Sequence, residues 1–218
     1  MVLSGTKMQG PGRKKAAVPA ELGVDVHRLR LLEGFAAAVS EHGYPPLTIA
    51  HIVKHARVSK RTFYEHFADK EECFLALYAE ATEILRKGVD HALRAPAASW
   101  QKQLEAGLDA YLSALEENPA LTRACLLEIN AAGPRALELR LSGHAKFATL
   151  LREFVERARK KHPELRPLTP TMATAIVGGI DELLLVNVEA GLTSRLGEIR
   201  ETAVELLRAV IGVQVTPG

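Results

Sequence analysis

The chain contains, at residues 48–70, the stretch TIAHIVKHARVSKRTFYEHFADK, in which a short turn joins two amphipathic segments. In the first segment, apolar residues recur at positions i, i+3, i+4 and i+7, the pattern of a helix that faces a core. The second segment continues this apolar face. A turn this short predicts two helices packed against each other. The apolar residues are Ile49, Ile52, Val53 and Ala56 before the turn, and Val58, Phe63 and Phe67 after it.

The outward positions of the second segment carry basic, hydroxyl, phenolic and imidazole groups. A small helix with such groups is suited to lie against DNA, where contacts to phosphates fix its position and contacts to base edges read the sequence. The pattern therefore predicts a DNA-reading helix-turn-helix. The outward residues are Lys60, Arg61, Thr62, Tyr64 and His66.

The longer stretch GYPPLTIAHIVKHARVSKRTFYEHFADKEECFLAL, residues 43–77, resembles the helix-turn-helix of the TetR family of one-component transcriptional regulators. The usual form of that motif has a Gly-Tyr pair after the first helix and a Thr that opens the second. A Val-Ser turn, a Thr-Phe-Tyr-x-His-Phe recognition helix and a Lys-Glu pair follow. The specific resemblance covers roughly residues 29–77, and beyond them only the all-helical layout of the family matches.

Two polar side chains precede the helices of the motif. Thr48 and Ser59 are predicted to cap the second and third helices, and each cap leaves the helix N-terminus available to a phosphate. Lys60 and Arg61 lie where this docking mode places side chains on base edges. Arg61 suits guanine O6 and N7, a pairing that gives about 1–3 kcal/mol of discrimination. The alternatives are capping alone for the first pair and a solvated helix face for the second.

The resemblance implies further contacts at the DNA surface. Tyr64 and His66 would contact backbone phosphates or nearby bases, and Lys70 is similar to a lysine with which the family grips a phosphate. For His66, a place inside the head is an equal alternative. Arg57 departs from the motif because it occupies a turn position where the family typically has glycine. If this residue is left-handed, the arginine costs roughly 1–2 kcal/mol that glycine would not.

Composition agrees with a basic head on a larger body. Residues 1–70 carry 11 Lys and Arg against 6 Asp and Glu, whereas residues 71–218 carry 17 against 20. No run of about eighteen apolar residues is present, so no membrane span is expected. The N-terminus has no apolar signal-peptide segment. The two cysteines, Cys73 and Cys125, lie far apart and suggest neither a disulfide framework nor a zinc site. A cytoplasmic protein is expected.

Proline and glycine punctuate a helical pattern along the whole chain, and no period-two strand pattern is present. We expect an all-α fold of about nine helices, with a flexible basic arm at 1–24 and a three-helix head at 25–68. A helical body for ligand binding and dimerisation is expected at 69–218. The predicted helices cover residues 25–42, 48–56, 59–67, 69–94, 99–118, 119–131, 134–162, 171–190 and 195–213.

The last two predicted helices are apolar enough to form a four-helix interface with a second copy of the chain. Gly178 and Gly179, inside the first of them, are consistent with a close helix approach. Burial within one subunit is the alternative. The body is also expected to hold a small-molecule effector, with an apolar or amphipathic one preferred. Its candidate polar and aromatic residues are Trp100, Tyr111, Cys125, Glu128, Asn130, His144, Phe147, Asp181 and Asn187.

The favoured interpretation is a homodimeric repressor that a ligand releases from a palindromic operator in double-stranded DNA. An effector-independent or activating DNA-binding regulator with the same head is the alternative. An enzyme is disfavoured, because the chain has no Gly-rich phosphate loop and no nucleophile elbow. No cofactor is expected. His51 and His55 have the i, i+4 spacing of a metal-binding pair, but exposed helix histidines near DNA explain them better.

Overall fold

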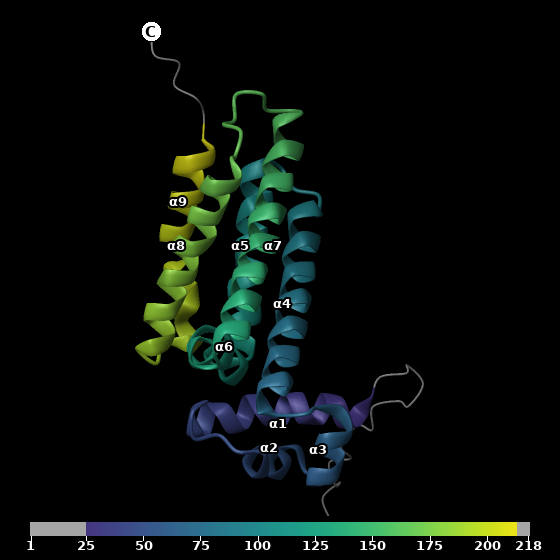
Figure 1. The fold of residues 1–218 in the computed structure, drawn as a ribbon. Helices are drawn as coiled ribbons and strands as arrows, with labels where there is room; N and C mark the ends of the chain where they lie inside the picture. Colours follow the sequence, from purple (N-terminus) through teal and green to yellow (C-terminus); the bar gives the residue numbers. More distant parts are fainter. Residues whose placement is uncertain (1–24, 213–218) are drawn as a thin grey trace, which may run out of the picture.

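The computed structural model describes residues 25–212, and within them the protein is all-α, as predicted (Figure 1). Three short helices form a head at one end of a bundle of longer helices. The basic arm predicted at 1–24 and the end of the last predicted helix at Val213 lie outside the described residues. The α-helices are α1 (Val26–His42), α2 (Ile49–Ala56), α3 (Lys60–His66), α4 (Lys70–Arg94), α5 (Trp100–Glu117), α6 (Pro119–Leu126), α7 (Pro134–Arg159), α8 (Pro170–Glu189) and α9 (Arg200–Ile211), with 3₁₀ helices η2 (Glu128–Ala131) and η3 (Thr193–Ile199).

Side-chain caps fix where the helices of the head begin. Asp25, Thr48, Ser59 and Asp69 each accept a hydrogen bond from a backbone amide of the helix that follows. At α2 the cap is reciprocal, because the ring Nδ1 of His51 accepts from the backbone N–H of Thr48. These caps satisfy amides that the first helical turn leaves without partners.

Two of the predicted helices are each divided in the structure into an α-helix and a 3₁₀ helix. The helix expected at 119–131 stops at Leu126 and continues as η2, where the side-chain amide of Asn130 donates to the carbonyl of Leu126 at 3.3 Å. The helix expected at 195–213 is divided into η3, which ends at Ile199, and α9, which begins at Arg200, and Arg195 inside η3 has a non-helical φ of −133°. Periodicity did not reveal these breaks, since apolar residues keep helical spacing across both.

Two apolar cores lie along α4. The head core joins α1, α2 and α3 to the first turns of α4, and the rings of Phe35 and Phe74 stack within it with their centroids 4.9 Å apart. The body core packs the far half of α4, from Val89 to Leu93, against α5, α7, α8 and α9. Helix α4 therefore belongs to both cores, and Figure 1 shows it rising from the head into the bundle.

Helix α8 leaves much of its apolar surface uncovered. Met172 and Val186 are 45% and 57% exposed. This is the one helix in the described part of the chain that is long and apolar enough to cross a membrane, with a mean hydropathy of 1.4 over eighteen residues. Length and composition alone are weak evidence for a span, and α8 carries Asp181 and Glu182 at its middle. An uncovered helix–helix interface has the same composition.

The close packing of α1 against α2 at Gly34 can be tested by substitution. A Cβ atom added there would lie 2.6 Å from the backbone nitrogen of Ala56, so α1 and α2 would have to separate. We expect Gly34→Ala to lower the free energy of unfolding by about 1–3 kcal/mol, measured by urea denaturation. Gly88→Ala on α4 is the control, because it meets open space and should stabilise by up to about 1 kcal/mol. Equal effects of the two substitutions would contradict this packing.

Candidate nucleic-acid interface and internal cavity

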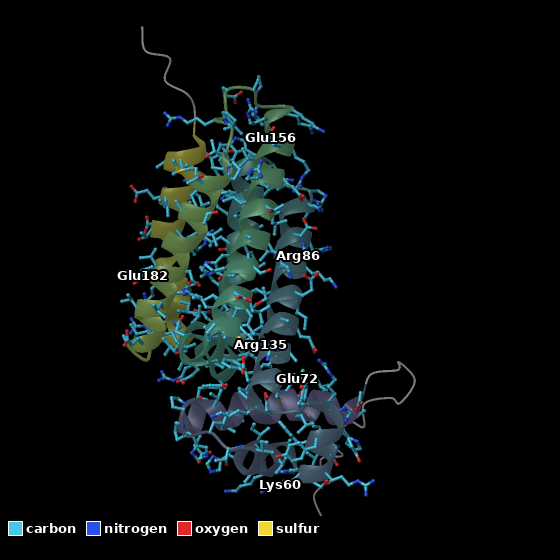
Figure 2. All side chains as sticks on the ribbon, in the orientation of Figure 1. Lys60, Glu72, Arg86, Arg135, Glu156 and Glu182 are labelled. Carbon is cyan, nitrogen blue, oxygen red and sulfur yellow. The ribbon has the colours of Figure 1, made fainter. Side chains whose placement is uncertain are left out.

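Helix α3 presents an open face at the far end of the head, where Figure 2 shows Lys60 pointing away from the molecule. The side chain of Arg61 is 90% exposed, and Tyr64 is 59% exposed. The Arg61 guanidinium pairs with Glu65 at 3.1 Å, an exposed contact that contributes little and is easily exchanged for another partner. Lys60, Arg61 and Tyr64 thus form one accessible basic and aromatic face, which we call the α3 face.

The hydroxyl groups predicted at the helix starts act as caps in the structure. Thr48 accepts from the amide of His51 at 3.3 Å, and Ser59 accepts from the amide of Thr62 at 3.0 Å. The hydroxyl of Thr62 also lies 2.9 Å from that of Ser59. Thr48 and Ser59 are exposed and Thr62 is half-buried, so contact with phosphate stays a prediction for all three.

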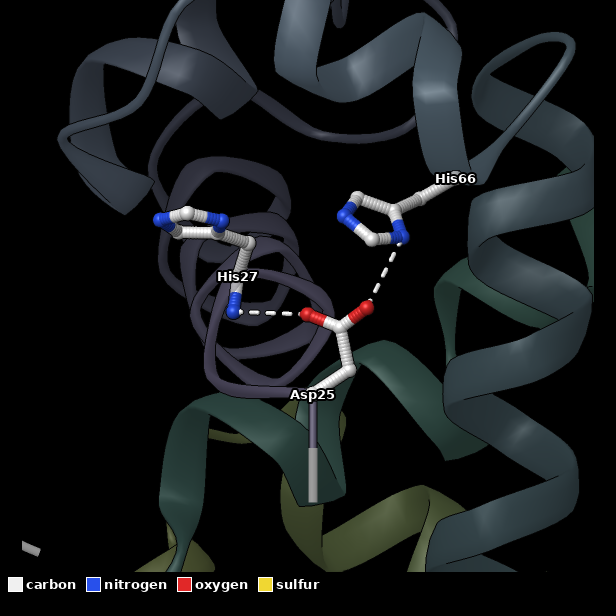
Figure 3. Close-up of side chains that lie close together, drawn as sticks. All are labelled: Asp25, His27 and His66. Atoms are coloured by element: carbon white, nitrogen blue, oxygen red, sulfur yellow. Dashed lines mark hydrogen bonds and ion pairs between the residues drawn. The ribbon is translucent and has the colours of Figure 1, made fainter. Parts of the chain in front are cut away.

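His66 is turned away from the α3 face. Figure 3 shows its ring directed at the Asp25 carboxylate, with 3.4 Å between Nδ1 and Oδ2. The same carboxylate accepts from the backbone amides of His27 and Arg28, and these bonds, first that of Arg28, lower its pKa. The pair therefore joins the end of α3 to the start of α1. The structure does not bring His66 to the other predicted DNA-binding residues.

Lys70 holds the connection between α1 and α2. Its ammonium group donates to the carbonyls of Tyr44, Pro45 and Leu47 at 3.0, 3.1 and 2.9 Å and lies 4.6 Å from the centroid of the Tyr44 ring. An ammonium has three N–H donors, so this arrangement uses all of them. The structure thus gives Lys70 a positioning role, and its predicted contact with phosphate stays a prediction.

Arg57 occupies the left-handed region, with φ 55° and ψ 46°. It is the one residue other than glycine with positive φ among residues 25–212. The departure from the motif therefore places a strained, exposed cation at the turn between α2 and α3. Its left-handed conformation is the one that a glycine would adopt at this turn at lower cost.

The histidines of α2 do not share a ligand position. His51 takes part in the α2 cap and stacks near His42 with ring centroids 4.2 Å apart, whereas His55 pairs with Glu41 at 3.1 Å. The ligand atoms of Glu41, His42 and His55 lie within 4.8 Å of one another, as do those of a second group around Asp25. Ion pairs and hydrogen bonds within the head account for both groups.

The body holds a cavity of two adjoining chambers, both partly open to the surface, that share Tyr111, Phe147 and Val177 as lining residues. The smaller chamber, of about 90 Å³, which we call the inner chamber because it is lined by body-core side chains, is walled by apolar side chains of α4, α5, α7, α8 and α9. The outer chamber, of about 290 Å³, has polar groups in its wall. Those polar residues are Tyr78, Thr82, Glu117, Asn118, Thr122, Cys125, His144 and Asp181.

Five of the residues predicted for an effector site line this cavity, and four do not. Tyr111, Cys125, His144, Phe147 and Asp181 face the chambers. Trp100 lies at separate surface hollows, Glu128 bonds to the backbone of Tyr44, and Asn187 donates to the carbonyl of Leu183. Asn130, in η2, donates to the carbonyl of Leu126 and accepts from Arg140. Tyr78 and Thr82, which share one face of α4 at i, i+4 spacing, also line the cavity and were not predicted.

Asp181 is the charged group of the outer chamber, and it is 7% exposed. Its carboxylate accepts from Arg140 at 2.5 Å and lies 3.4 Å from Nε2 of His144. Burial alone would raise the pKa of Asp181, but the hydrogen bonds and charges of His144 and Arg140 outweigh burial and lower it. The carboxylate is therefore ionised and compensated, as a buried charge must be.

The thiol and the two phenol groups of the cavity are neutral. Burial raises the pKa of the Cys125 thiol to about 12, so the reactive thiolate is suppressed. Burial also raises the pKa values of Tyr78 and Tyr111, which keeps their hydroxyl groups protonated. The outer chamber thus offers hydroxyl, thiol and carboxylate groups, among them the compensated Asp181, and the inner chamber offers apolar surface.

Asp181→Asn tests the compensated charge. A carboxylate with a lowered pKa stabilises the fold above its unfolded-state pKa, and this contribution is lost as the pH falls through the folded-state value. We expect the substitution to lower the free energy of unfolding by about 1–3 kcal/mol at pH 7, because Arg140 and His144 lose their partner. The difference from the parent protein should shrink below pH 4 in denaturant titrations. A difference that is constant with pH would contradict an ionised Asp181.

Comparisons with known proteins agree with this architecture. Residues 31–77 match a family model described as bacterial regulatory proteins, tetR family. Among solved structures, FadR of Bacillus halodurans, a fatty acid degradation regulator, superposes with a TM-score of 0.76 at 18% identity, covering 86% of this chain and 97% of that one. FadR of Bacillus subtilis, solved with stearoyl-CoA, gives 0.73 at 18% identity, covering 84% and 99%.

SmeT, the repressor of a Stenotrophomonas maltophilia multidrug efflux pump, gives a TM-score of 0.68 at 17% identity, covering 88% of this chain and 94% of that one. The search of curated proteins finds no match. At these identities the likeness shows the fold.

Proposed function

Because the chain carries the DNA-binding domain of the TetR family on a TetR-like helical body, we propose that it is a homodimeric repressor released from its operator by a small molecule. It is a DNA-binding transcriptional regulator of that family and not an enzyme. The observation that carries the proposal is the α3 face, a basic surface on a recognition helix that no other part of the described chain covers.

The α3 face would enter the major groove, with Lys60 and Arg61 at base edges and Tyr64 against the backbone. Phosphates would bind at the exposed N-termini of α2 and α3, close to Thr48 and Ser59. Lys70 would act indirectly, by holding the connection that aims α2. Two heads would then read half-sites about 34–36 Å apart in a palindromic operator.

The uncovered surface of α8 supports a dimer through the last two helices. A second copy would bury Met172 and Val186 and the half-buried side chains beside them. A Cβ atom added at Gly178 would meet no atom within 4 Å, so this part of α8 is open to a close helix approach. Four helices, two from each copy, would form the interface.

The two chambers support an elongated, amphipathic effector. An apolar chain would occupy the inner chamber, and a polar group would bind near His144 and Asp181 in the outer one. The B. subtilis FadR structure holds stearoyl-CoA, a ligand with a long acyl chain, and this supports the same ligand class here. A preformed cavity also favours a ligand-responsive regulator over an effector-independent one. Effector and operator would weaken each other by the same factor.

The proposal is tested by titrating purified protein against labelled DNA from upstream of its own gene, across a range of salt concentrations. Tight, selective binding of a dimer with a steep salt dependence is expected. Weak binding that does not distinguish this DNA from random DNA would remove self-regulation, and failure to bind at every salt concentration would contradict the proposal.

Arg61→Ala tests the reading of bases. We expect the substitution to weaken operator binding by about 10- to 100-fold and to relax the preference at one base pair, because a bidentate contact to guanine is lost. The measurement is competition between the operator and single-base variants. Arg94→Ala on α4 is the matched control, because Arg94 is also an exposed arginine in an i, i+4 pair with a carboxylate. Unchanged affinity and selectivity in Arg61→Ala would contradict the assignment.

Val186→Asp tests the dimer. A carboxylate at the centre of an apolar interface has no partner, so we expect the mass from sedimentation equilibrium to fall from that of two chains to that of one. Ile84→Asp, at a 72% exposed residue on α4, should leave the dimer intact. A dimer that survives Val186→Asp would show that α8 is not the interface.

A further inference from the structure

We infer that Glu128 is a positioning residue of the DNA-binding head, which transmits the state of the internal cavity to the connection between α1 and α2. The inference rests on the proposed function for its biological meaning. It rests on the described contacts for its physical content. These contacts form an unbroken path that starts at the cavity wall, crosses η2 and ends at the N-terminus of α2.

The head end of the path is a single hydrogen bond between segments 84 residues apart. The Tyr44 amide donates to Oε2 of Glu128 at 2.7 Å. Gly43, the C-cap of α1, has a φ of +72°, and a Cβ atom built on it would lie 3.7 Å from the same oxygen. The carboxylate thus lies close against the chain at the exact point where α1 ends.

The connection that Glu128 holds is tight and short. Tyr44 is buried, and its ring and carbonyl both contact the ammonium group of Lys70, which also binds the carbonyls of Pro45 and Leu47. Thr48, the cap of α2, follows immediately. A displacement of Tyr44 must therefore move the N-terminus of α2, which is one of the proposed phosphate sites.

The carboxylate of Glu128 lies in an electrostatically unfavourable position, at the C-terminal end of α1. The C-terminal end of a helix carries a partial negative charge, which repels a carboxylate. No Lys, Arg or His nitrogen lies within 4.0 Å of the Glu128 carboxylate among residues 25–212. The hydrogen bond from the Tyr44 amide opposes this repulsion, so the contact is easier to break than a compensated ion pair.

The cavity end of the path begins at Asp181. Arg140 donates through one terminal nitrogen to Asp181 at 2.5 Å and through the other to the side-chain oxygen of Asn130 at 3.3 Å. Asn130 and Glu128 belong to the same 3₁₀ helix, η2. A ligand group that draws Asp181 or Arg140 out of place therefore pulls on the segment that holds Tyr44.

Helix α6 provides a second connection between the outer chamber and η2. Thr122, Cys125 and Leu126 line the outer chamber, and η2 begins two residues after α6 ends. The side-chain amide of Asn130 also donates to the carbonyl of Leu126. Displacement of α6 by a ligand is thus carried into η2 through both the backbone and a side chain.

Apolar packing is the alternative means of coupling. Ala124, Ile129 and Ala132 are buried in the head core and join the same segment to α1 and α4. Packing of this kind is unaffected when Glu128 loses only its carboxylate. Variants of Glu128 and Asn130 therefore separate the hydrogen-bonded path from the apolar contacts.

The test is hydrogen–deuterium exchange of the full-length protein, followed at residues 43–57 and, for comparison, along α8. We expect Glu128→Ala to speed exchange at residues 43–57 by about tenfold, because the Tyr44 amide loses its side-chain acceptor. Glu128→Gln keeps an acceptor oxygen and should restore most of the protection. Exchange along α8 should not change. Glu138→Ala, at an exposed glutamate of α7, is the matched control and should leave both regions unchanged.

A double substitution tests transmission. Asn130→Ala removes the acceptor of Arg140 and should also speed exchange at residues 43–57, yet add nothing in a protein that already carries Glu128→Ala. Full additivity, or exchange in Glu128→Ala equal to that of the parent protein, overturns the inference. Neither outcome depends on DNA or on a ligand. Failure of the operator titration would thus contradict the proposed function while leaving this result in place.

Discussion

The arrangement of this protein depends on α4 being a member of two apolar cores at once. Its first turns are fixed to the head by the stacked rings of Phe35 and Phe74, and its last turns pack in the body around Val89 and Leu93. A helix of 25 residues is stiff, so a tilt at the body end displaces the head. The cavity lies against the middle of the same helix, at Tyr78 and Leu85. The wall of the cavity and the position of the head therefore share one mechanical element.

The boundary between head and body illustrates what a sequence pattern leaves open. A division before residue 69 follows from the cap at Asp69, and that cap exists. The head core nevertheless extends along α4 to Tyr78 and takes in Ile129 and Ala136 from the body. Contacts between segments so distant along the chain have no periodic pattern, whereas caps and helix faces are local. The division into domains at 68 and 69 thus stays a prediction.

The candidate sites divide in the same way. The exposed positions of Lys60, Arg61 and Tyr64 follow from helical spacing around Phe63 and Phe67, and the structure agrees with that spacing. His66 and Lys70 depend on partners from α1 and from the connection after it, which no local pattern specifies. In the body, Tyr111 and Asp181 were found by their polarity on apolar helices. Glu128 has the same polarity but lies against Tyr44 outside the cavity, because polarity does not say which neighbour a side chain meets.

The uncovered apolar face of α8 has a consequence for the amount of protein in a cell. On the proposed dimer, each copy covers the other's exposed side chains, so folding and association become one concentration-dependent equilibrium. Occupancy of a two-half-site operator then rises more steeply than in proportion to the number of chains. Such a regulator responds to its own concentration with a threshold. Below a certain level of synthesis the protein is less stable and largely absent from DNA. Above that level it is both stably folded and bound to DNA.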